Sequence, residues 1–274
     1  MGDIADLIEA RFGLAAEAGR DMTADGVLAQ ILRRRSFRKY TDEDVPEFMR
    51  AILLAVAQSA SAKSDLQQYS IIDLRDQKSK ERLSELCATD WMRDAPVLLV
   101  FCGDIRRAQR IAGMRGKAYV QNTLDSFFNA AVDAALAMQS YVIAAEDAGL
   151  GCCAISQVRN EMPEVSSLLK LPEGVYPVAG LAAGYPAEIR DVTLRLPPTV
   201  VVHTDISDDT GLEAEIKAYD SRRNAIRPMR QIMTDKYGTA ANYSWSENVA
   251  RRLSVPEARA GFRAFLESHG FDLE

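Results

Sequence analysis

A run of cationic side chains near the N-terminus could bind an anion. In "RRRSFRKYTDEDV", residues 33–45, five of the first seven residues are arginine or lysine. Arg33, Arg35 and Arg38 could converge on one anion while Ser36 donates its hydroxyl, because the planar guanidinium group suits phosphate oxygens. Each charge-assisted hydrogen bond contributes about 1.5–3 kcal/mol, so a few of them can hold a phosphorylated molecule. A solvated helix face and a nucleic-acid contact are the competing interpretations.

The charge of the whole chain argues against nucleic acid. The 274 residues carry a formal net charge of −6, whereas general nucleic-acid binding depends on neutralising many phosphates. The N-terminus has acids where a signal peptide needs bases, and no uninterrupted apolar stretch approaches the roughly 20 residues of a membrane span. We therefore expect a cytoplasmic protein with no nucleic-acid partner and no membrane partner.

Residue types that would support other chemistries are sparse. The two histidines, His203 and His269, stand far apart, and the four cysteines form no C-x-x-C pair, so no metal site is expected. We interpret the cysteines as buried thiols and leave the role of the Cys152–Cys153 pair open. The chain has no G-x-G-x-x-G or P-loop motif, and we find no catalytic triad or paired carboxylates.

Apolar periodicity predicts the elements that would position a site. Strands are expected in "YSIIDL", "APVLLVFC", "GCCAIS" and "VYPVAGLAAGYP". The second of these runs is continuously apolar, so it should be buried on both faces. Helices are expected near residues 3–19, 27–35, 46–60, 78–89, 124–149, 162–171, 211–234 and 246–270. Because helices and strands do not alternate strictly, the predicted fold class is α+β with three layers rather than a doubly wound sheet.

The predicted helix over residues 124–149 is the most informative core element. It is apolar almost all round and ends at Gly149. A helix that is apolar on every face should be buried on every face, in the heart of a domain or of a dimer. Asp133 is the only charge in its middle, and we interpret it as a hydrogen-bonded structural carboxylate rather than an acid catalyst.

Five segments resemble motifs of the FMN-dependent nitroreductase family and stand in the family's order. They are "RRRSFRKYTDEDV", "SASAKSDLQQYSII", "AAEDAGLGCCAIS", "LLKLPEGVYPVAGLAAGYPAE" and "TLRLPPTVVVH". A later segment, "YSWSENVARR", looks most like the branch of NADPH-preferring, oxygen-insensitive nitroreductases and flavin reductases. The resemblance implies a central, mostly antiparallel sheet flanked by helices. It also implies an N-terminal helical extension (1–26), an FMN-binding domain (27–203) and a C-terminal helical extension (204–274) packed on the core or on a dimer partner.

The resemblance also assigns residues to the phosphate end of FMN. Arg34, Arg35, Ser36 and Arg38 match the opening motif, which holds the FMN phosphate and ribityl chain. Arg195 matches the arginine of the closing motif and should add to phosphate binding. The family often has Lys-Pro-Arg where this chain has Thr-Leu-Arg at residues 193–195, so one cation is missing.

Other residues are assigned in the same way to the flavin ring and to NADPH. Ser64 and Gln67 match a second loop, near the isoalloxazine ring of the site in the partner subunit. Four successive residues match the segment that lies against the ring: Ala154, Ile155, Ser156 and Gln157. The family commonly has Gly-Gly at the last two of these positions, and an apolar or amide residue where Asp65 stands. Lys236 or Arg230 could select the 2′-phosphate of NADPH.

By this resemblance the chain is an FMN-dependent oxidoreductase. It would take hydride from NAD(P)H, with NADPH favoured over NADH, and reduce nitroaromatics, quinones or flavins by a ping-pong mechanism. The resemblance implies a homodimer with FMN at the interface, and no catalytic side chain is expected because the flavin carries the chemistry. A flavin-binding sensor and a specialised flavin enzyme of the same fold, such as a reductive dehalogenase or an ene reductase, are the alternatives.

Overall fold

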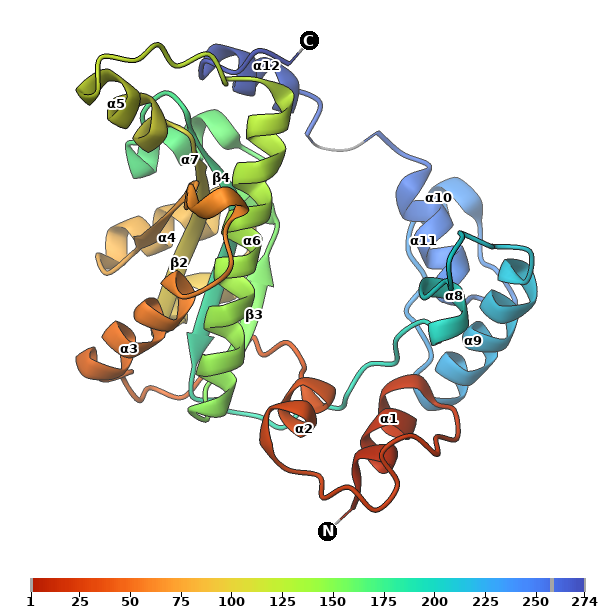
Figure 1. Ribbon diagram of the computed structural model, residues 1–274. Coiled ribbons are helices and arrows are strands. Elements are labelled where there is room, and N and C mark those ends of the chain that lie inside the picture. Colours follow the sequence, from red (N-terminus) through yellow and green to blue (C-terminus); the bar gives the residue numbers. More distant parts are fainter. Residues whose placement is uncertain (1, 257–258, 274) are drawn as a thin grey trace. The chain divides into compact units, whose positions relative to one another are not determined.

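The computed structural model describes residues 2–256 and 259–273 and divides the chain into two compact units (Figure 1). The helical unit comprises the described residues of Met1–Arg34 and Asp191–Glu257, and the sheet unit those of Arg35–Arg190 and Ala258–Glu274. The expected boundaries at residues 26 and 203 follow the order of the sequence. In the structure, residues 27–34 and 191–203 of the expected FMN-binding domain belong to the helical unit, and the described residues of 258–274 belong to the sheet unit. The boundary between Arg34 and Arg35 falls inside the cationic run.

The sheet unit is built on an antiparallel sheet with the strand order β1-β2-β4-β3. The strands are β1 (Tyr69–Asp73), β2 (Val97–Asp104), β3 (Gly151–Ile155) and β4 (Val175–Gly184). Every residue of β2 is buried, which confirms the prediction that this continuously apolar run is covered on both faces.

Helices cover both faces of this sheet (Figure 1). On one face, α3 (Glu47–Gln58) and α6 (Leu124–Asp147) share a core with alternate residues of the strands. On the other face, α4 (Gln77–Leu86) and α7 (Met162–Leu169) cover the intervening residues. The three-layer α+β architecture predicted from the sequence is confirmed.

A smaller aromatic cluster closes one end of the sheet unit. Helix α12 (Phe262–Ser268) brings Phe265 and Leu266 against Tyr176 of β4. The Tyr176 hydroxyl donates a hydrogen bond of 2.5 Å to the carbonyl of Phe127 in α6. Helix α12 therefore packs on the sheet unit. Helix α5 (Arg106–Met114), which the sequence analysis did not predict, follows β2 in the chain.

Helix α6 is buried on one side only within a single chain. Ala130, Ala134 and Ala137 are fully buried, as is Asp133 at 1% exposure. The opposite side carries a stripe of exposed apolar side chains, Phe128, Val132 and Leu136, with 62%, 38% and 42% exposure. The expectation of burial on every face is therefore wrong for the isolated chain. By length and composition α6 is the one described helix that could cross a membrane, a test that core helices of soluble proteins also pass.

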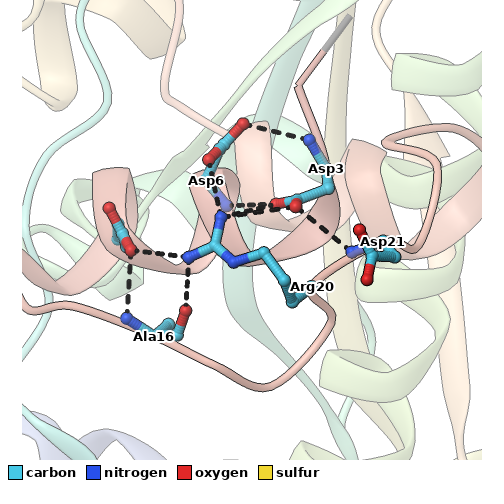
Figure 2. Close-up of polar contacts among 6 residues, drawn as sticks. Asp3, Asp6, Ala16, Arg20 and Asp21 are labelled. Atoms are coloured by element: carbon cyan, nitrogen blue, oxygen red, sulfur yellow. Dashed lines mark hydrogen bonds and ion pairs between the residues drawn. The ribbon is translucent and has the colours of Figure 1, made fainter.

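The helical unit contains α1 (Ile4–Phe12), α2 (Gly26–Arg33), α8 (Pro198–Val201), α9 (Leu212–Ile226), α10 (Thr234–Tyr237) and α11 (Trp245–Leu253). Helix α1 is shorter than predicted because Gly13 adopts a left-handed conformation, φ 66°, and ends it. The segment after Gly13 folds back along α1, and Arg20 holds it there (Figure 2).

Arg20 forms ion pairs with three carboxylates of the first helix. Its distances to Asp3, Asp6 and Glu9 are 3.3, 3.2 and 3.1 Å. Asp3 also caps the helix by accepting the backbone N–H of Asp6. That hydrogen bond, more than the charge of Arg20, lowers the pKa of Asp3 below its usual value. Figure 2 shows these contacts together with the backbone carbonyl of Ala16, which accepts from Arg20 at 2.8 Å.

Candidate functional site

The cationic run leaves its helix almost at once. Helix α2 ends at Arg33, and Ser36 forms a parallel bridge with Cys152 of the edge strand β3. The backbone N–H of Phe37 donates to the Cys152 carbonyl at 3.1 Å, and Thr41 donates to Tyr185 just beyond β4. Most of the run is therefore extended chain beside the sheet, and the interpretation as a solvated helix face is wrong after Arg33.

The cations of the run that lie in the sheet unit differ in their surroundings. Arg35 is half-buried, with its guanidinium 5.7 Å from the centre of the Phe37 ring. Lys39 pairs with Glu188 at 3.1 Å. Arg38 is exposed, and no described residue forms an ion pair with it. Arg38, two residues after Ser36, thus has a guanidinium available for an external anion.

The two remaining phosphate-binding candidates, Arg34 and Arg195, meet at Arg11 in the helical unit. Arg11 is only 5% exposed. Its side chain donates to the carbonyls of Leu32 (3.0 Å), Thr193 (3.1 Å) and Arg34 (2.5 Å), and its own carbonyl accepts the N–H of Arg195 at 2.9 Å. Arg11 therefore joins the opening motif to the closing motif. The sequence analysis missed it because an arginine in an amphipathic helix carries no local sign of burial.

The segment predicted to face the flavin ring, residues 154–157, comprises the last two residues of β3 and the start of the turn that follows. Ala154 is exposed on the strand and Ile155 is buried under it, while Ser156 and Gln157 are exposed in the turn that follows. Arg259 donates to the Ser156 carbonyl at 3.1 Å and to its hydroxyl at 3.2 Å. This arginine places a positive charge beside the segment, and nothing local in the sequence identified it.

The second predicted flavin loop has an unusual backbone. Ser64, Asp65 and Gln67 all have positive φ values, 51°, 57° and 51°. Each such non-glycine residue costs about 1 kcal/mol or more. The side chains of Ser64 and Gln67 are exposed, and the Gln67 amide donates to the Asp65 carboxylate at 3.1 Å. The loop is thus a strained segment whose polar groups face outward.

The sheet determines which of these parts lie together in one chain. The opening motif and the segment 154–157 share the β3 edge, where Cys152, the bridge partner of Ser36, stands two strand residues or roughly 7 Å before Ala154. The loop 64–67 precedes β1 on the opposite edge, with β2 and β4 between. Three strand spacings, roughly 14 Å, therefore separate it from segment 154–157 of the same chain.

The candidates for binding NADPH, Arg230 and Lys236, are exposed residues of the helical unit. Buried Arg251 fixes the segment that contains Lys236. It donates hydrogen bonds to the carbonyls of Ile232 (2.9 Å) and Gly238 (3.0 Å), on either side of that lysine. Lys236 lies 5.0 Å from the centre of the Tyr237 ring. Hydrogen bonding from Lys236, followed by that from a neighbouring serine, lowers the pKa of Tyr237.

All four cysteines lie in the sheet unit. All four are buried and free of disulfides, and Cys152 and Cys153 are successive strand residues whose side chains point to opposite faces of the sheet. Burial raises the pKa of Cys87 and of Cys102 to about 12. Among the described residues, no group of three or more His, Cys, Asp or Glu could hold a metal ion.

The donors along the β3 edge fit a long molecule with an anionic end and a polar, uncharged end. Cations and a hydroxyl gather where Ser36 meets β3. Backbone and side-chain amides lie where the strand ends, with the guanidinium of Arg259 bonded to Ser156 there. The chemistry of these donors suits FMN, whose phosphate and flavin ring differ in the same way.

Comparison with known proteins places the chain in a family. The model of the nitroreductase family matches residues 31–91 and 74–185, and the model of the nitroreductase family C-terminal domain matches residues 194–274. The chain therefore belongs to the nitroreductase family. The predicted resemblance is confirmed, including its branch.

Three similar proteins illustrate this membership. An FMN reductase [NAD(P)H] of Bacillus subtilis (strain 168) is 34% identical over 256 residues, 90% of this chain and 98% of the relative. An oxygen-insensitive NADPH nitroreductase of Salmonella typhimurium is 31% identical over 238 residues, 86% of this chain and 94% of the relative. The solved structure of NfrA2 from B. megaterium is 32% identical and superposes with a TM-score of 0.82, covering 90% of this chain and 98% of that one.

Proposed function

We propose that this protein is an NAD(P)H-dependent FMN oxidoreductase that reduces nitroaromatics, quinones or flavins, with NADPH favoured over NADH. The observation that carries the proposal is the β3 edge, where Arg35, Ser36 and Arg38 run beside the strand that ends in the exposed segment 154–157. The enzyme class agrees with relatives named FMN reductase and NADPH nitroreductase. The acceptor and the nucleotide preference are part of the proposal.

The residues of the chain bind and orient; they do not react. Arg35, Ser36 and Arg38 of the sheet unit are proposed to hold the phosphate and ribityl chain. When bound, FMN supplies reversible hydride acceptance at its N5 atom. Backbone and side-chain donors of residues 154–157 would face the ring, and Arg259 adds positive charge there through Ser156. No side-chain acid or base is required. In the proposed ping-pong mechanism, the nicotinamide donor and the electron acceptor occupy the same site over the flavin ring in turn.

We further propose that the active form is a cytoplasmic homodimer with FMN at the interface. Two observations support the dimer. The loop carrying Ser64 and Gln67 is on the sheet edge opposite to segment 154–157 of the same chain, three strand spacings or roughly 14 Å away. Helix α6 also exposes an apolar stripe of the kind that marks an interaction surface. A second copy would contribute Ser64 and Gln67 to the site of the first.

The visible absorbance spectrum of the purified protein tests the proposed function. A flavin spectrum that bleaches on anaerobic addition of NADPH, with FMN released on denaturation, is the expected result. A bound flavin that stays oxidised with both NADPH and NADH would instead favour the flavin-binding sensor. A colourless protein that cannot be loaded with FMN would refute the proposal.

Substitution of Lys236 tests the nucleotide preference. If its ammonium contacts the 2′-phosphate, Lys236→Ala should raise the KM for NADPH by about tenfold, the value of one charge-assisted contact, and leave the KM for NADH unchanged. Steady-state kinetics with both nucleotides measures this difference. Arg230→Ala is the matched variant in the same segment. A variant pair in which the KM values for both nucleotides rise together would assign the two residues to general binding rather than to selection.

A further inference from the structure

The loop of residues 64–67 cannot keep its conformation unaided. Three of its four residues, Ser64, Asp65 and Gln67, occupy the left-handed region that side chains other than glycine rarely adopt. All four residues are exposed, so apolar burial does not hold them. Such a backbone persists only where the surrounding structure determines it, and two groups outside the loop do so.

The first group is the carboxylate of Asp133 in α6. Its Oδ1 accepts the backbone N–H of Lys63 at 2.9 Å, and its Oδ2 accepts the backbone N–H of Gln68 at 2.9 Å. These two N–H groups flank the loop on either side, so one carboxylate fixes both of its ends. Asp133 is 1% exposed. Its hydrogen bonds confirm the prediction of a structural carboxylate, and both oxygens are engaged away from the exposed tip of the loop.

The second group is the guanidinium of Arg107 in α5. It donates to the carbonyl of Gln67 at 2.7 Å and to that of Tyr69 at 3.0 Å. Asp104 orients it through an ion pair of 3.3 Å, and the N–H of Asp104 donates to the Gln68 carbonyl at 2.9 Å. At the C-terminal end of the loop, Asp133 therefore accepts the backbone N–H of Gln68, while Arg107 and Asp104 donate to the backbone carbonyls of Gln67 and Gln68.

We propose that Asp133, assisted by Arg107, is a positioning residue that holds the loop 64–67 in the conformation that presents the Ser64 hydroxyl and the Gln67 amide to the flavin. The proposal rests on the proposed function, since it assigns these two side chains to the flavin site. Asp133 acts through two backbone N–H groups and touches neither cofactor nor substrate. The three polar residues of the loop and Leu66 can then all be exposed, because their backbone is fixed by Asp133 and Arg107.

The variant Asp133→Asn tests this positioning role with little change in side-chain volume. An amide has one acceptor oxygen, so the variant must lose one of the two hydrogen bonds. We expect amide hydrogen exchange in residues 63–68 of the apoprotein to accelerate by about tenfold or more while β2 stays protected. In the FMN-loaded protein, the Kd for FMN should rise by about tenfold, and the absorption maximum and reduction potential of the flavin should shift. A purely structural role would lower Tm without changing these flavin properties at temperatures well below Tm.

Asp147→Asn provides the matched control, because it makes the same change at an exposed position at the end of the same helix. Wild type and this control should bind FMN equally. If neither binds FMN, the proposed function fails, whatever Asp133 does. If both bind FMN, and Asp133→Asn exchanges faster in residues 63–68 but keeps the wild-type Kd and flavin spectrum, the positioning role is refuted.

Arg107→Lys provides a second test should Asp133→Asn fail to fold. Arg107 has a half-exposed side chain, and lysine keeps the charge but loses the fork that reaches both carbonyls. Faster exchange at Gln68 and Tyr69, with a raised Kd for FMN and a shifted flavin spectrum, would support the proposal. Unchanged exchange or an unchanged Kd in this variant would overturn it.

Discussion

Leu136→Glu is expected to convert the proposed homodimer to a monomer and to remove its FMN. Leu136 lies on the exposed apolar stripe of α6 with Phe128 and Val132, so a single chain tolerates a carboxylate there. In a symmetric dimer the substitution would place an unpaired charge in the interface twice. Each uncompensated buried charge costs about 3–5 kcal/mol, so the two together raise the dimer dissociation constant by roughly ten-thousandfold or more. Sedimentation velocity and flavin content measure the two effects.

Met114→Glu is the control for this prediction. It introduces the same charge at an apolar residue of α5 that is 82% exposed, and the protein should remain dimeric and yellow. Circular dichroism should show that both variants retain their helices. A Leu136→Glu protein that sediments as a dimer with full flavin content would show that the stripe is not the interface.

Arg38→Ala is expected to weaken FMN binding by roughly tenfold to a hundredfold. The guanidinium of Arg38 is exposed and pairs with no described carboxylate, so its removal should affect the cofactor and leave the fold intact. The magnitude is that of one charge-assisted hydrogen bond, about 1.5–3 kcal/mol. Titration of the apoprotein with FMN, followed by flavin fluorescence, gives the Kd.

Lys39→Ala makes the matched change one residue away. Lys39 pairs with Glu188, and the loss of that exposed ion pair should leave the Kd for FMN within about twofold of wild type. If the two variants lower affinity equally, the run attracts FMN by general charge alone. If Arg38→Ala purifies with full flavin content, the assignment of Arg38 to the phosphate is wrong.

The sequence predicted the three layers because they depend on patterns that are local. A continuously apolar run became the buried strand β2, and the apolar residues 124–149 became α6. The position of the cationic run beside β3 depends on a bridge between Ser36 and Cys152, residues that are far apart in sequence. No local pattern encodes such a bridge, so the run could equally have continued as helix.

The supporting arginines were missed for a related reason. Arg11, Arg107 and Arg259 each act on backbone carbonyls of distant segments, and any backbone carbonyl can serve as acceptor, so their partners leave no mark in the sequence. Asp133 was noticed because a charge within an apolar helix is conspicuous. The sequence showed that Asp133 needs hydrogen-bond donors, and the structure supplied the backbone N–H groups of Lys63 and Gln68.

Val132 and Asp133 are adjacent on α6. Val132 belongs to the exposed apolar stripe, whereas Asp133 accepts hydrogen bonds from the two ends of the loop 64–67. A single helix is therefore both the surface offered to a second chain and the anchor of a loop. A change that moves or rotates α6 should therefore alter both properties together. A chimera that receives α6 from a relative should acquire that relative's pairing preference together with its loop geometry, and recombination within the helix should separate them only at a cost to both.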